Sequence, residues 1–211
     1  MIVHGSTLSP FVRKVMAFAA EKGLAAENRI APPGPKTPEF LAMSPFGKIP
    51  AFEDGDYQLC DSSAIVHYLE AKHPDHALIP IEARARGRAI WFDEYADTIM
   101  FSAAAPIFFN RVVAKLMGMA GDLAAADKAE AETLPPVLDY LESVIPASGF
   151  LVEDRLTLAD IAVASPFANF AHAGVCIDPA RFPKVTGYAA AMLARPSFAA
   201  LVAKESAFLA R

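Results

Sequence analysis

The chain changes character near residue 78, and this change constrains the fold more than any other feature of the sequence. Before it, short strand-like apolar segments alternate with helical segments and with turns rich in proline and glycine. After about Glu82 the strand signals end, and alanine-rich segments with helical spacing follow. At 211 residues the chain can bury two small cores. We therefore predict an α/β domain over residues 1–76, a linker over 77–84 and an all-α domain over 85–211.

The first domain is predicted to have the order β-α-β-β-β-α. Strands are expected at 1–4 and 27–31, and residues 50–53 and 57–60 are expected to form a hairpin around a turn at 54–56. Helices are expected at 11–22, where Gly23 follows, and at 62–73, where Pro74 follows. The segment APPGPKTP, residues 31–38, has four prolines and one glycine, and we interpret it as a loop.

The second domain is predicted to be helical throughout. One helical stripe is formed by Leu134, Leu138, Leu141 and Ile145, with a kink or a helix start at Pro135-Pro136. Residues 157–160, TLAD, form a capping box, which we interpret only as a helix start because nothing in it offers chemistry. The apolar segment 161–177 is interrupted by polar residues and predicts a buried core helix rather than a membrane span. Two short helices separated by Pro196 are expected at the end.

Composition excludes several classes of function. The net charge is −5 and no basic stripe is present, so nucleic acid is not an expected partner. Neither a membrane partner nor a secretory leader is indicated, and we expect a cytoplasmic protein. Cys60 and Cys176 have no CxxC spacing, which is typical of two reduced thiols. The five histidines show no metal-ligand spacing, so no metal is predicted.

Four segments in order carry a resemblance to a known family. They are SPFVRKV at 9–15, SPFGKIPAFED at 44–54, DSSAIVHYLE at 61–70 and LTLADI at 156–161. Together with the predicted element order, they resemble the cytosolic glutathione transferases, of a serine-type, bacterial-like kind whose class is left open. The resemblance covers nearly the whole chain. It implies a thioredoxin-like first domain, glutathione as co-substrate, transfer to a small apolar electrophile, a role in detoxification and a homodimer.

Ser9 has two interpretations. With Pro10 after it, Ser9 is a typical helix N-cap. In thioredoxin-like redox proteins a cysteine stands at this position, and the resemblance implies that the Ser9 hydroxyl donates a hydrogen bond to the sulfur of glutathione. Such a bond favours the thiolate, and the positive end of the following helix lowers the thiol pKa further. Ser6 and Thr7 are the nearby hydroxyls that compete for this role.

The resemblance also implies how the rest of glutathione is held. A cis bond before Pro50 would turn Ile49 so that its backbone pairs with the cysteinyl part, although X-Pro bonds are cis in only about 5–6% of folded cases. Lys36 and Lys48 would bind the glycyl carboxylate, and Ser62 and Asp61 would bind the γ-glutamyl carboxylate and ammonium. Ordinary interpretations stay open: each lysine alone can be a solvated surface charge, and Asp61-Ser62 can be an ordinary helix cap. Aspartate replaces the glutamate of many family members, which shortens its reach.

The electrophile pocket and the dimer contact rest on the resemblance alone. The pocket would lie between the domains, with Leu8 and Phe11 from the first and Phe108 and Arg111 from the second, the arginine as an anion contact. Aromatic residues at helical spacing are also typical of a core. Phe46, on the loop before Pro50, would insert into a partner subunit.

Two other function classes stay open. The first is a non-catalytic glutathione-transferase-like binding or regulatory protein, which would bind glutathione without conjugation. The second is a glutathione-dependent thiol-transferase or isomerase relative, for which a thiol-transferase would carry a cysteine at position 9. The natural electrophile, and the choice between conjugation, isomerisation and peroxide reduction, are not predicted.

Overall fold

The computed structural model of the protein describes residues 1–30 and 36–210. By its internal contacts the chain divides into two compact units, which are described separately. Unit 1 comprises Met1–Pro80 and Pro196–Arg211, and unit 2 comprises Ile81–Arg195. The contacts divide the chain between Pro80 and Ile81 and place residues 196–210 with unit 1, whereas the sequence predicted them in the all-α domain; the linker at 77–84 stays a prediction.

Unit 1 contains a four-stranded mixed sheet with strand order β2-β1-β3-β4. The strands are β1 (Ile2–His4), β2 (Glu27–Arg29), β3 (Ala51–Asp54) and β4 (Tyr57–Cys60). β1 pairs parallel to β2 and antiparallel to β3, and β3 forms a hairpin with β4. The predicted strands and hairpin are confirmed, and Gly55 supplies the positive φ that the turn between β3 and β4 requires.

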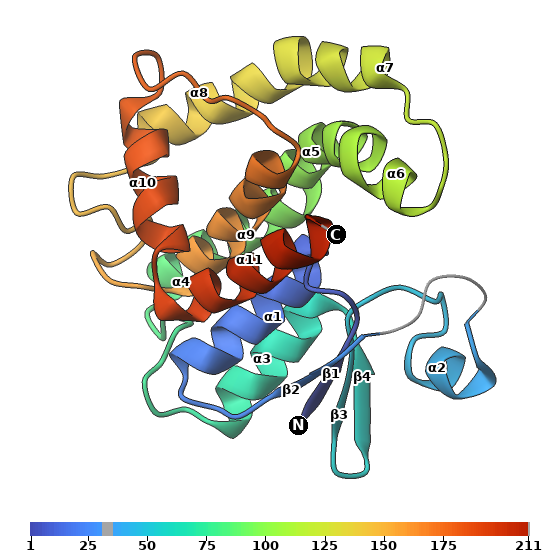
Figure 1. Cartoon of the computed structure of the whole chain (residues 1–211). Coiled ribbons are helices and arrows are strands. Elements are labelled where there is room, and N and C mark those ends of the chain that lie inside the picture. Colours follow the sequence, from blue (N-terminus) through green and yellow to red (C-terminus); the bar gives the residue numbers. More distant parts are fainter. Residues whose placement is uncertain (31–35, 211) are drawn as a thin grey trace. The chain divides into compact units, whose positions relative to one another are not determined.

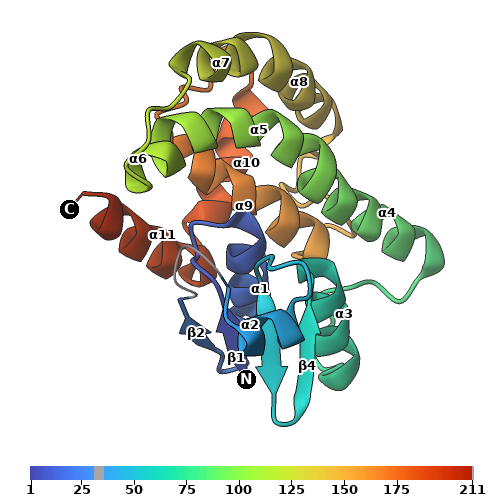
Figure 2. The same cartoon turned by 90° about the vertical axis from the view of Figure 1, so that its right-hand side faces the viewer.

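Helices cover both faces of this sheet. They are α1 (Pro10–Glu21), α2 (Pro38–Met43) and α3 (Ser62–Lys72), and Figures 1 and 2 show α1 and α3 on one face and α2 on the other. α1 ends at Lys22 before Gly23, as predicted, and buries Val12, Val15 and Phe18. α2 was not predicted. The Thr37 side chain accepts a hydrogen bond from the Phe40 amide at 3.2 Å, and Pro38 occupies the first helical position.

The strand register brings four loops to one edge of the sheet. His4, the last residue of β1, is opposite Ala51, the first residue of β3, and Ala51 is opposite Cys60, the last residue of β4. On the other side His4 is opposite Arg29, the last residue of β2. Since adjacent strands are about 4.8 Å apart, the segments that contain residues 5–9, 36, 48–50 and 61–62 all begin or end at this edge.

The remaining helix of unit 1 is α11 (Pro196–Leu209), which lies beside α1 in Figure 1. Glu205 of α11 is buried and forms an ion pair with Arg13 of α1. Near the opposite end of α1, the Ser197 hydroxyl donates to the Glu21 carboxylate at 2.5 Å. Unit 1 is therefore assembled from both ends of the chain.

Unit 2 is helical apart from one isolated β-bridge between Val152 and Arg155. Its helices are α4 (Ala83–Glu94), α5 (Phe101–Phe108), α6 (Ala114–Leu116), α7 (Leu123–Lys128), α8 (Leu134–Val144), α9 (Leu158–His172) and α10 (Pro183–Leu193). Three π-helical segments join them: η1 (Tyr95–Met100), η2 (Phe109–Val113) and η3 (Ala129–Thr133). α9 is buried from Leu158 to Phe170 and forms the core of the unit, as predicted.

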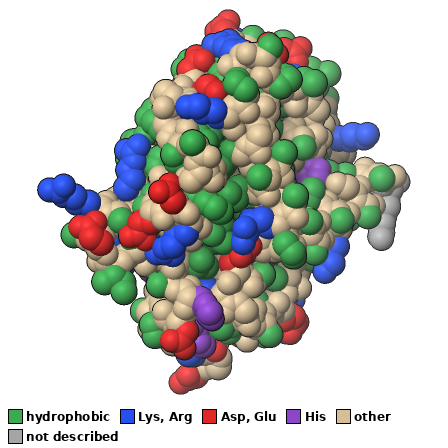
Figure 3. Space-filling view, turned by 90° about the vertical axis from the view of Figure 1, so that its left-hand side faces the viewer, with side chains coloured by type: hydrophobic (Ala, Val, Ile, Leu, Met, Phe, Trp, Pro, Cys, Tyr) green, Lys and Arg blue, Asp and Glu red, His purple; other side chains and the backbone are tan. Residues whose placement is uncertain are grey.

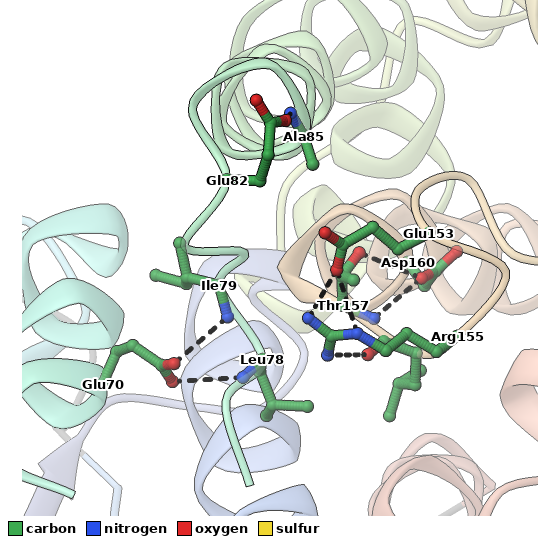
Figure 4. A network of polar contacts seen from close by, with 10 residues as sticks. Glu70, Leu78, Ile79, Glu82, Ala85, Glu153, Arg155, Thr157 and Asp160 are labelled. Atoms are coloured by element: carbon green, nitrogen blue, oxygen red, sulfur yellow. Dashed lines mark hydrogen bonds and ion pairs between the residues drawn. The ribbon is translucent and has the colours of Figure 1, made fainter. Parts of the chain in front are cut away.

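Two side chains fix the ends of segments in unit 2, and Figure 4 shows both. The Glu82 carboxylate accepts from the Ala85 amide at 2.8 Å and caps α4. The Asp160 carboxylate accepts from the Thr157 amide at 2.9 Å and from the Leu151 amide at 2.8 Å. The predicted capping box is thus present, and its aspartate also anchors the preceding loop. Burial raises the pKa of Asp160 to about 6, although these hydrogen bonds oppose the shift.

One continuous helical segment, Ala83–Leu116, is long and apolar enough to cross a membrane by length and composition, with a mean hydropathy of 1.4 in its most apolar part. Helices of soluble proteins pass the same test, and the charged residues of α4 precede the apolar part. On the face in Figure 3, acidic and basic side chains are interspersed with hydrophobic ones. This face shows no extended field of one sign that would attract a polyanion.

Candidate active site

The candidate site lies at the edge of the sheet of unit 1 where four loops meet. Gly5 begins the first of these loops with φ +135, and a Cβ there would come within 2.9 Å of the Ile49 Cβ and 2.7 Å of the Val12 side chain. Only glycine allows the loop before α1 to approach the loop before β3 this closely. Asn28 holds the same turn, since its side-chain amide donates to the Val3 and Gly5 carbonyls at 3.1 and 2.9 Å.

Ser9 stands at the N-terminus of α1 with an extended backbone, φ −74 and ψ 125. Its carbonyl accepts the Arg13 amide at 3.0 Å, so its backbone is in the cap position. Its hydroxyl accepts no capping hydrogen bond and has no hydrogen-bond partner in residues 1–30 and 36–210. The half-buried Ser9 hydroxyl is therefore available to a ligand at the positive end of a twelve-residue helix.

The two rival hydroxyls differ from Ser9 in their surroundings. Ser6 Oγ accepts from the Leu8 amide at 3.3 Å, so this oxygen already stabilises the turn before the helix. The Thr7 hydroxyl, like that of Ser9, has no partner in the described part of the chain, but Thr7 lies in the loop rather than at the start of α1. Of these three hydroxyls, that of Ser9 combines an open hydrogen-bonding position with the N-terminus of a helix.

Ile49 and Pro50 follow on the second loop, and the peptide bond between them is cis, as the resemblance implies. Ser44 Oγ donates to the Lys48 carbonyl at 2.8 Å and fixes the preceding turn. No residue in the described ranges donates to the Ile49 carbonyl or accepts from the Ile49 amide. Half-buried backbone groups are normally paired, so these two groups can receive an extended peptide ligand.

Both predicted lysines of the site lie near Gly47. The Lys36 Cγ is 3.3 Å from the position that a Cβ on Gly47 would take, and the Lys36 Nζ is 5.3 Å from the centre of the Phe40 ring. Lys48 is the next residue after Gly47, and its side chain is exposed. Lys36 and Lys48 thus bring two positively charged side chains from different segments to the loop that contains Gly47.

Asp61 and Ser62 lie where β4 ends and α3 begins. Asp61 has φ 79, which is uncommon for a residue with a side chain and costs of order 1–3 kcal/mol. Its Oδ1 accepts from the Ala64 amide at 3.0 Å, so the residue does cap α3. Its other carboxylate oxygen has no partner within the described residues, and Ser62 is buried behind it. Strained backbone at a helix N-terminus is typical of a ligand site.

The four residues predicted for the electrophile pocket divide between the two units, and their common pocket stays a prediction. Leu8 and Phe11 are half-buried in unit 1, and Phe108 is half-buried in unit 2. Arg111 forms ion pairs with Asp127 at 2.7 Å and Glu130 at 2.5 Å, and these contacts raise the pKa of its guanidinium. Both carboxylates would compete with any anion that Arg111 was expected to bind.

Sequence reasoning missed three residues that support the site. Asn28 lies in the edge strand β2 and was not considered, although a polar residue within a strand is a usable signal. Arg13 is fully buried within the helix that follows Ser9, and its partner Glu205 is 192 residues away. No sequence spacing could have identified that pair. In residues 1–30 and 36–210 no group of three or more His, Cys, Asp or Glu side chains could hold a metal ion.

Two family models match this chain. The model of the glutathione S-transferase N-terminal domain matches residues 3–77, and that of the C-terminal domain matches residues 108–205. Glutathione S-transferase 3 of Zea mays is 36% identical over 210 residues, which cover 95% of this chain and 92% of that protein.

Solved structures show the same similarity. A glutathione S-transferase from Rhodospirillum rubrum superimposes with a TM-score of 0.87 at 27% identity and covers 95% of this chain and 90% of its own. Glutathione S-transferase I, solved with lactoylglutathione, gives a TM-score of 0.83 at 25% identity over 96% of this chain and 98% of its own. The chain belongs to the glutathione S-transferase family.

Proposed function

We propose that the protein is a glutathione transferase in which Ser9 activates the thiol of glutathione for attack on a small apolar electrophile. The observation that carries this proposal is the Ser9 hydroxyl, which stands without a hydrogen-bond partner among the described residues at the N-terminus of α1. Its neighbours at the same edge of the sheet offer polar groups that match the remaining parts of the tripeptide.

The chemistry follows from the charge on sulfur. A free thiol has a pKa of about 8.5, so only a few per cent is thiolate near neutral pH. A hydrogen bond donated by Ser9 Oγ and the positive end of α1 both favour the charged form and lower the pKa of the bound thiol. The thiol proton leaves to solvent, and the thiolate sulfur forms a bond to the electrophilic carbon of the second substrate. In a substitution, the bond from that carbon to the leaving group breaks and the group, such as a halide, departs with the electron pair. In an addition, the electron pair of the attacked double bond moves onto the acceptor, which takes a proton from solvent.

The rest of glutathione would be held by groups on the neighbouring loops of unit 1. The Ile49 amide and carbonyl would pair with the cysteinyl backbone across the cis Ile49–Pro50 turn. Ser62 and the N-terminus of α3 would bind the γ-glutamyl carboxylate, and the second oxygen of Asp61 its ammonium. Lys36 and Lys48 would bind the glycyl carboxylate. The lactoylglutathione complex of a relative supports a glutathione-shaped ligand.

The remaining attributes of the proposal rest on the resemblance. We propose a serine-type enzyme, a cytoplasmic location and a homodimer with Phe46 at the contact. The relatives named above come from Zea mays and Rhodospirillum rubrum, so a bacterial-like class is supported no better than a plant-like one. The natural electrophile is left open.

Replacement of Ser9 by alanine tests the proposal. A hydrogen bond to a thiolate contributes about 1.5–3 kcal/mol, so conjugation of a reactive aryl halide should fall about ten- to a hundred-fold. The pH profile of turnover should shift toward the pKa of free glutathione. Because the Ser9 hydroxyl makes no cap bond, thermal stability should fall less than the roughly 1 kcal/mol that a lost N-cap usually costs.

Matched variants separate the alternatives. Thr7→Ala and Ser6→Ala should retain the wild-type thiol pKa, whereas full activity of Ser9→Ala with a loss in Thr7→Ala would transfer the role to Thr7. Ser9→Cys places an acidified thiol at the helix N-terminus and should gain disulfide exchange with glutathione while losing conjugation. If the wild type binds glutathione but conjugates no electrophile of a broad panel, the non-catalytic alternative is the better description.

A further inference from the structure

We infer that Arg13 and Glu205 form a positioning pair, through which α11 holds the N-terminus of α1 and thereby the Ser9 hydroxyl in register with the bound sulfur. This inference rests on the proposed function of Ser9 and extends it to two residues that do not touch the substrate.

The pair has the geometry of a directional clamp. Arg13 Nε donates to Glu205 Oε1 at 3.1 Å, and Arg13 Nη2 donates to Glu205 Oε2 at 2.7 Å. Both side chains are almost completely buried, with 0% and 1% of their surface exposed. A two-pronged contact between a guanidinium and a carboxylate fixes orientation as well as distance. A buried apolar contact would allow α1 to slide along α11, whereas two directional hydrogen bonds oppose such sliding.

The clamp lies one helical turn from the proposed catalytic hydroxyl. The Arg13 amide donates to the Ser9 carbonyl at 3.0 Å, which is the first hydrogen bond of the helix. The Ser9 hydroxyl makes no hydrogen bond in the described ranges, and its backbone amide donates to the Ser6 carbonyl at 3.0 Å. The position of the Ser9 hydroxyl therefore follows the N-terminus of α1, and Arg13 holds that end of the helix. A displacement of about 1 Å at a reacting group can cost a factor of 10² in rate.

The stability of the fold does not by itself require an ion pair at this position. A buried ion pair can often be replaced by apolar residues of similar volume without loss of stability. α1 and α11 are also joined at their other ends by Glu21 and Ser197. Moreover, the two charges are opposite, so removing both together leaves the net charge of unit 1 unchanged. A change in the thiol pKa on such removal would report position rather than charge.

The test is the double variant Arg13→Met/Glu205→Leu, compared with Ser197→Ala as a control on the same two helices far from Ser9. The pKa of bound glutathione is measured from the ultraviolet absorbance of its thiolate, together with kcat, the Kd for glutathione and the free energy of unfolding. We expect the double variant to fold, to bind glutathione nearly as well, to raise the thiol pKa and to lower kcat about ten- to a hundred-fold. Ser197→Ala should leave the thiol pKa unchanged.

Two results would overturn the inference: a folded double variant with wild-type thiol pKa and kcat, or the same shift in Ser197→Ala. If the double variant does not fold, Arg13→Lys, which retains the charge but loses the two-pronged contact, is measured in the same way, and an unchanged thiol pKa there overturns the inference. Failure of the proposed function is distinct, because Ser9→Ala would then leave wild-type activity intact.

Discussion

At the scale of the residue, we propose that the Asp61 carboxylate serves both the fold and the ligand. One oxygen caps α3, and the other has no partner in the described part of the chain. Asparagine caps a helix as well as aspartate does but cannot pair with an ammonium as a charge. We therefore predict that Asp61→Asn retains the melting temperature and weakens glutathione binding about tenfold, the difference between a charged and a neutral hydrogen bond.

Isothermal titration with glutathione measures this effect. Asp56→Asn, an exposed aspartate in the turn between β3 and β4, controls for the general loss of one negative charge. Equal affinities of Asp61→Asn and the wild type would mean that Asp61 is only a cap.

Asp160 gives a prediction about pH. Burial raises the pKa of its carboxyl from 3.8 to about 6, so between these values the folded protein holds a proton that the unfolded chain has released. The contribution of this group to stability is therefore greatest below about pH 4 and is lost as the pH rises to about 6. In Asp160→Asn this part of the pH dependence should disappear.

Urea unfolding at several pH values measures the difference between Asp160→Asn and the wild type. The variant should also be less stable by about 1–3 kcal/mol above pH 6, because one of two buried backbone amides loses its acceptor. A constant difference across the pH range would contradict the raised pKa.

At the scale of the element, one ion pair in unit 1 ties the C-terminus of α1 to α3 and to residues 75–79. Lys22 Nζ is 2.7 Å from the Glu70 carboxylate and also donates to the Asp75 and His76 carbonyls. Figure 4 shows the Glu70 carboxylate as it accepts from the Leu78 and Ile79 amides, at 3.4 and 3.3 Å. A single carboxylate thus serves three segments.

Removal of Glu70 should be costly because it leaves a buried lysine without its opposite charge and two amides without their acceptor. We predict that Glu70→Ala lowers the free energy of unfolding by about 3–5 kcal/mol. In contrast, Glu27→Ala, which breaks an exposed ion pair with Arg29, should change it by less than about 1 kcal/mol. Denaturant unfolding compares the two variants, and equal effects would show that the Glu70 contacts add nothing beyond a surface pair.

The elements themselves were largely predictable from sequence, and the exceptions have physical reasons. Strands and helices with clear apolar periodicity, such as α1, β1 and the hairpin, appear within a few residues of their expected limits. α2 was missed because the prolines of the segment 31–38 were interpreted as breaking structure, whereas the last of them, Pro38, begins the helix. The buried Arg13 escaped notice because a charged residue does not mark a core face until its partner is known.

The candidate site was predictable to the extent that its motifs are local. Ser9, Ile49, Pro50, Asp61 and Ser62 were proposed from short segments and the family resemblance, and the strand register brings those segments to one edge. Contacts between distant segments, such as Asn28 with the Gly5 turn, depend on which strands pair. That information is contained in the tertiary structure rather than in any window of sequence.

At the scale of the whole molecule, Phe46 bears on assembly. Its side chain is 88% exposed on the loop after α2, which is unusual for a large aromatic residue. We predict a homodimer in which Phe46 is buried by the partner, and Phe46→Ala should weaken dimerisation by about 2 kcal/mol or more, as a central aromatic anchor does.

Sedimentation velocity over a range of concentrations measures the dimer constant. Phe208→Ala, an exposed phenylalanine on α11 of the same unit, is the matched control and should leave the dimer constant unchanged. A monomeric wild type, or equal dimer constants for the wild type and Phe46→Ala, would rule out this role for Phe46.

The composition of unit 1 from Met1–Pro80 and Pro196–Arg211 has a consequence for biosynthesis. A ribosome that has made the whole sheet must still translate all of Ile81–Arg195 before Glu205 emerges to meet Arg13. During that interval α1 carries a buried arginine without its carboxylate, and the edge that holds Ser9 is incomplete. The unit that we propose to bind glutathione is thus translated first but completed last, so that a nascent chain stalled before α11 should be open to proteolysis in α1 even though unit 2 has already been synthesised.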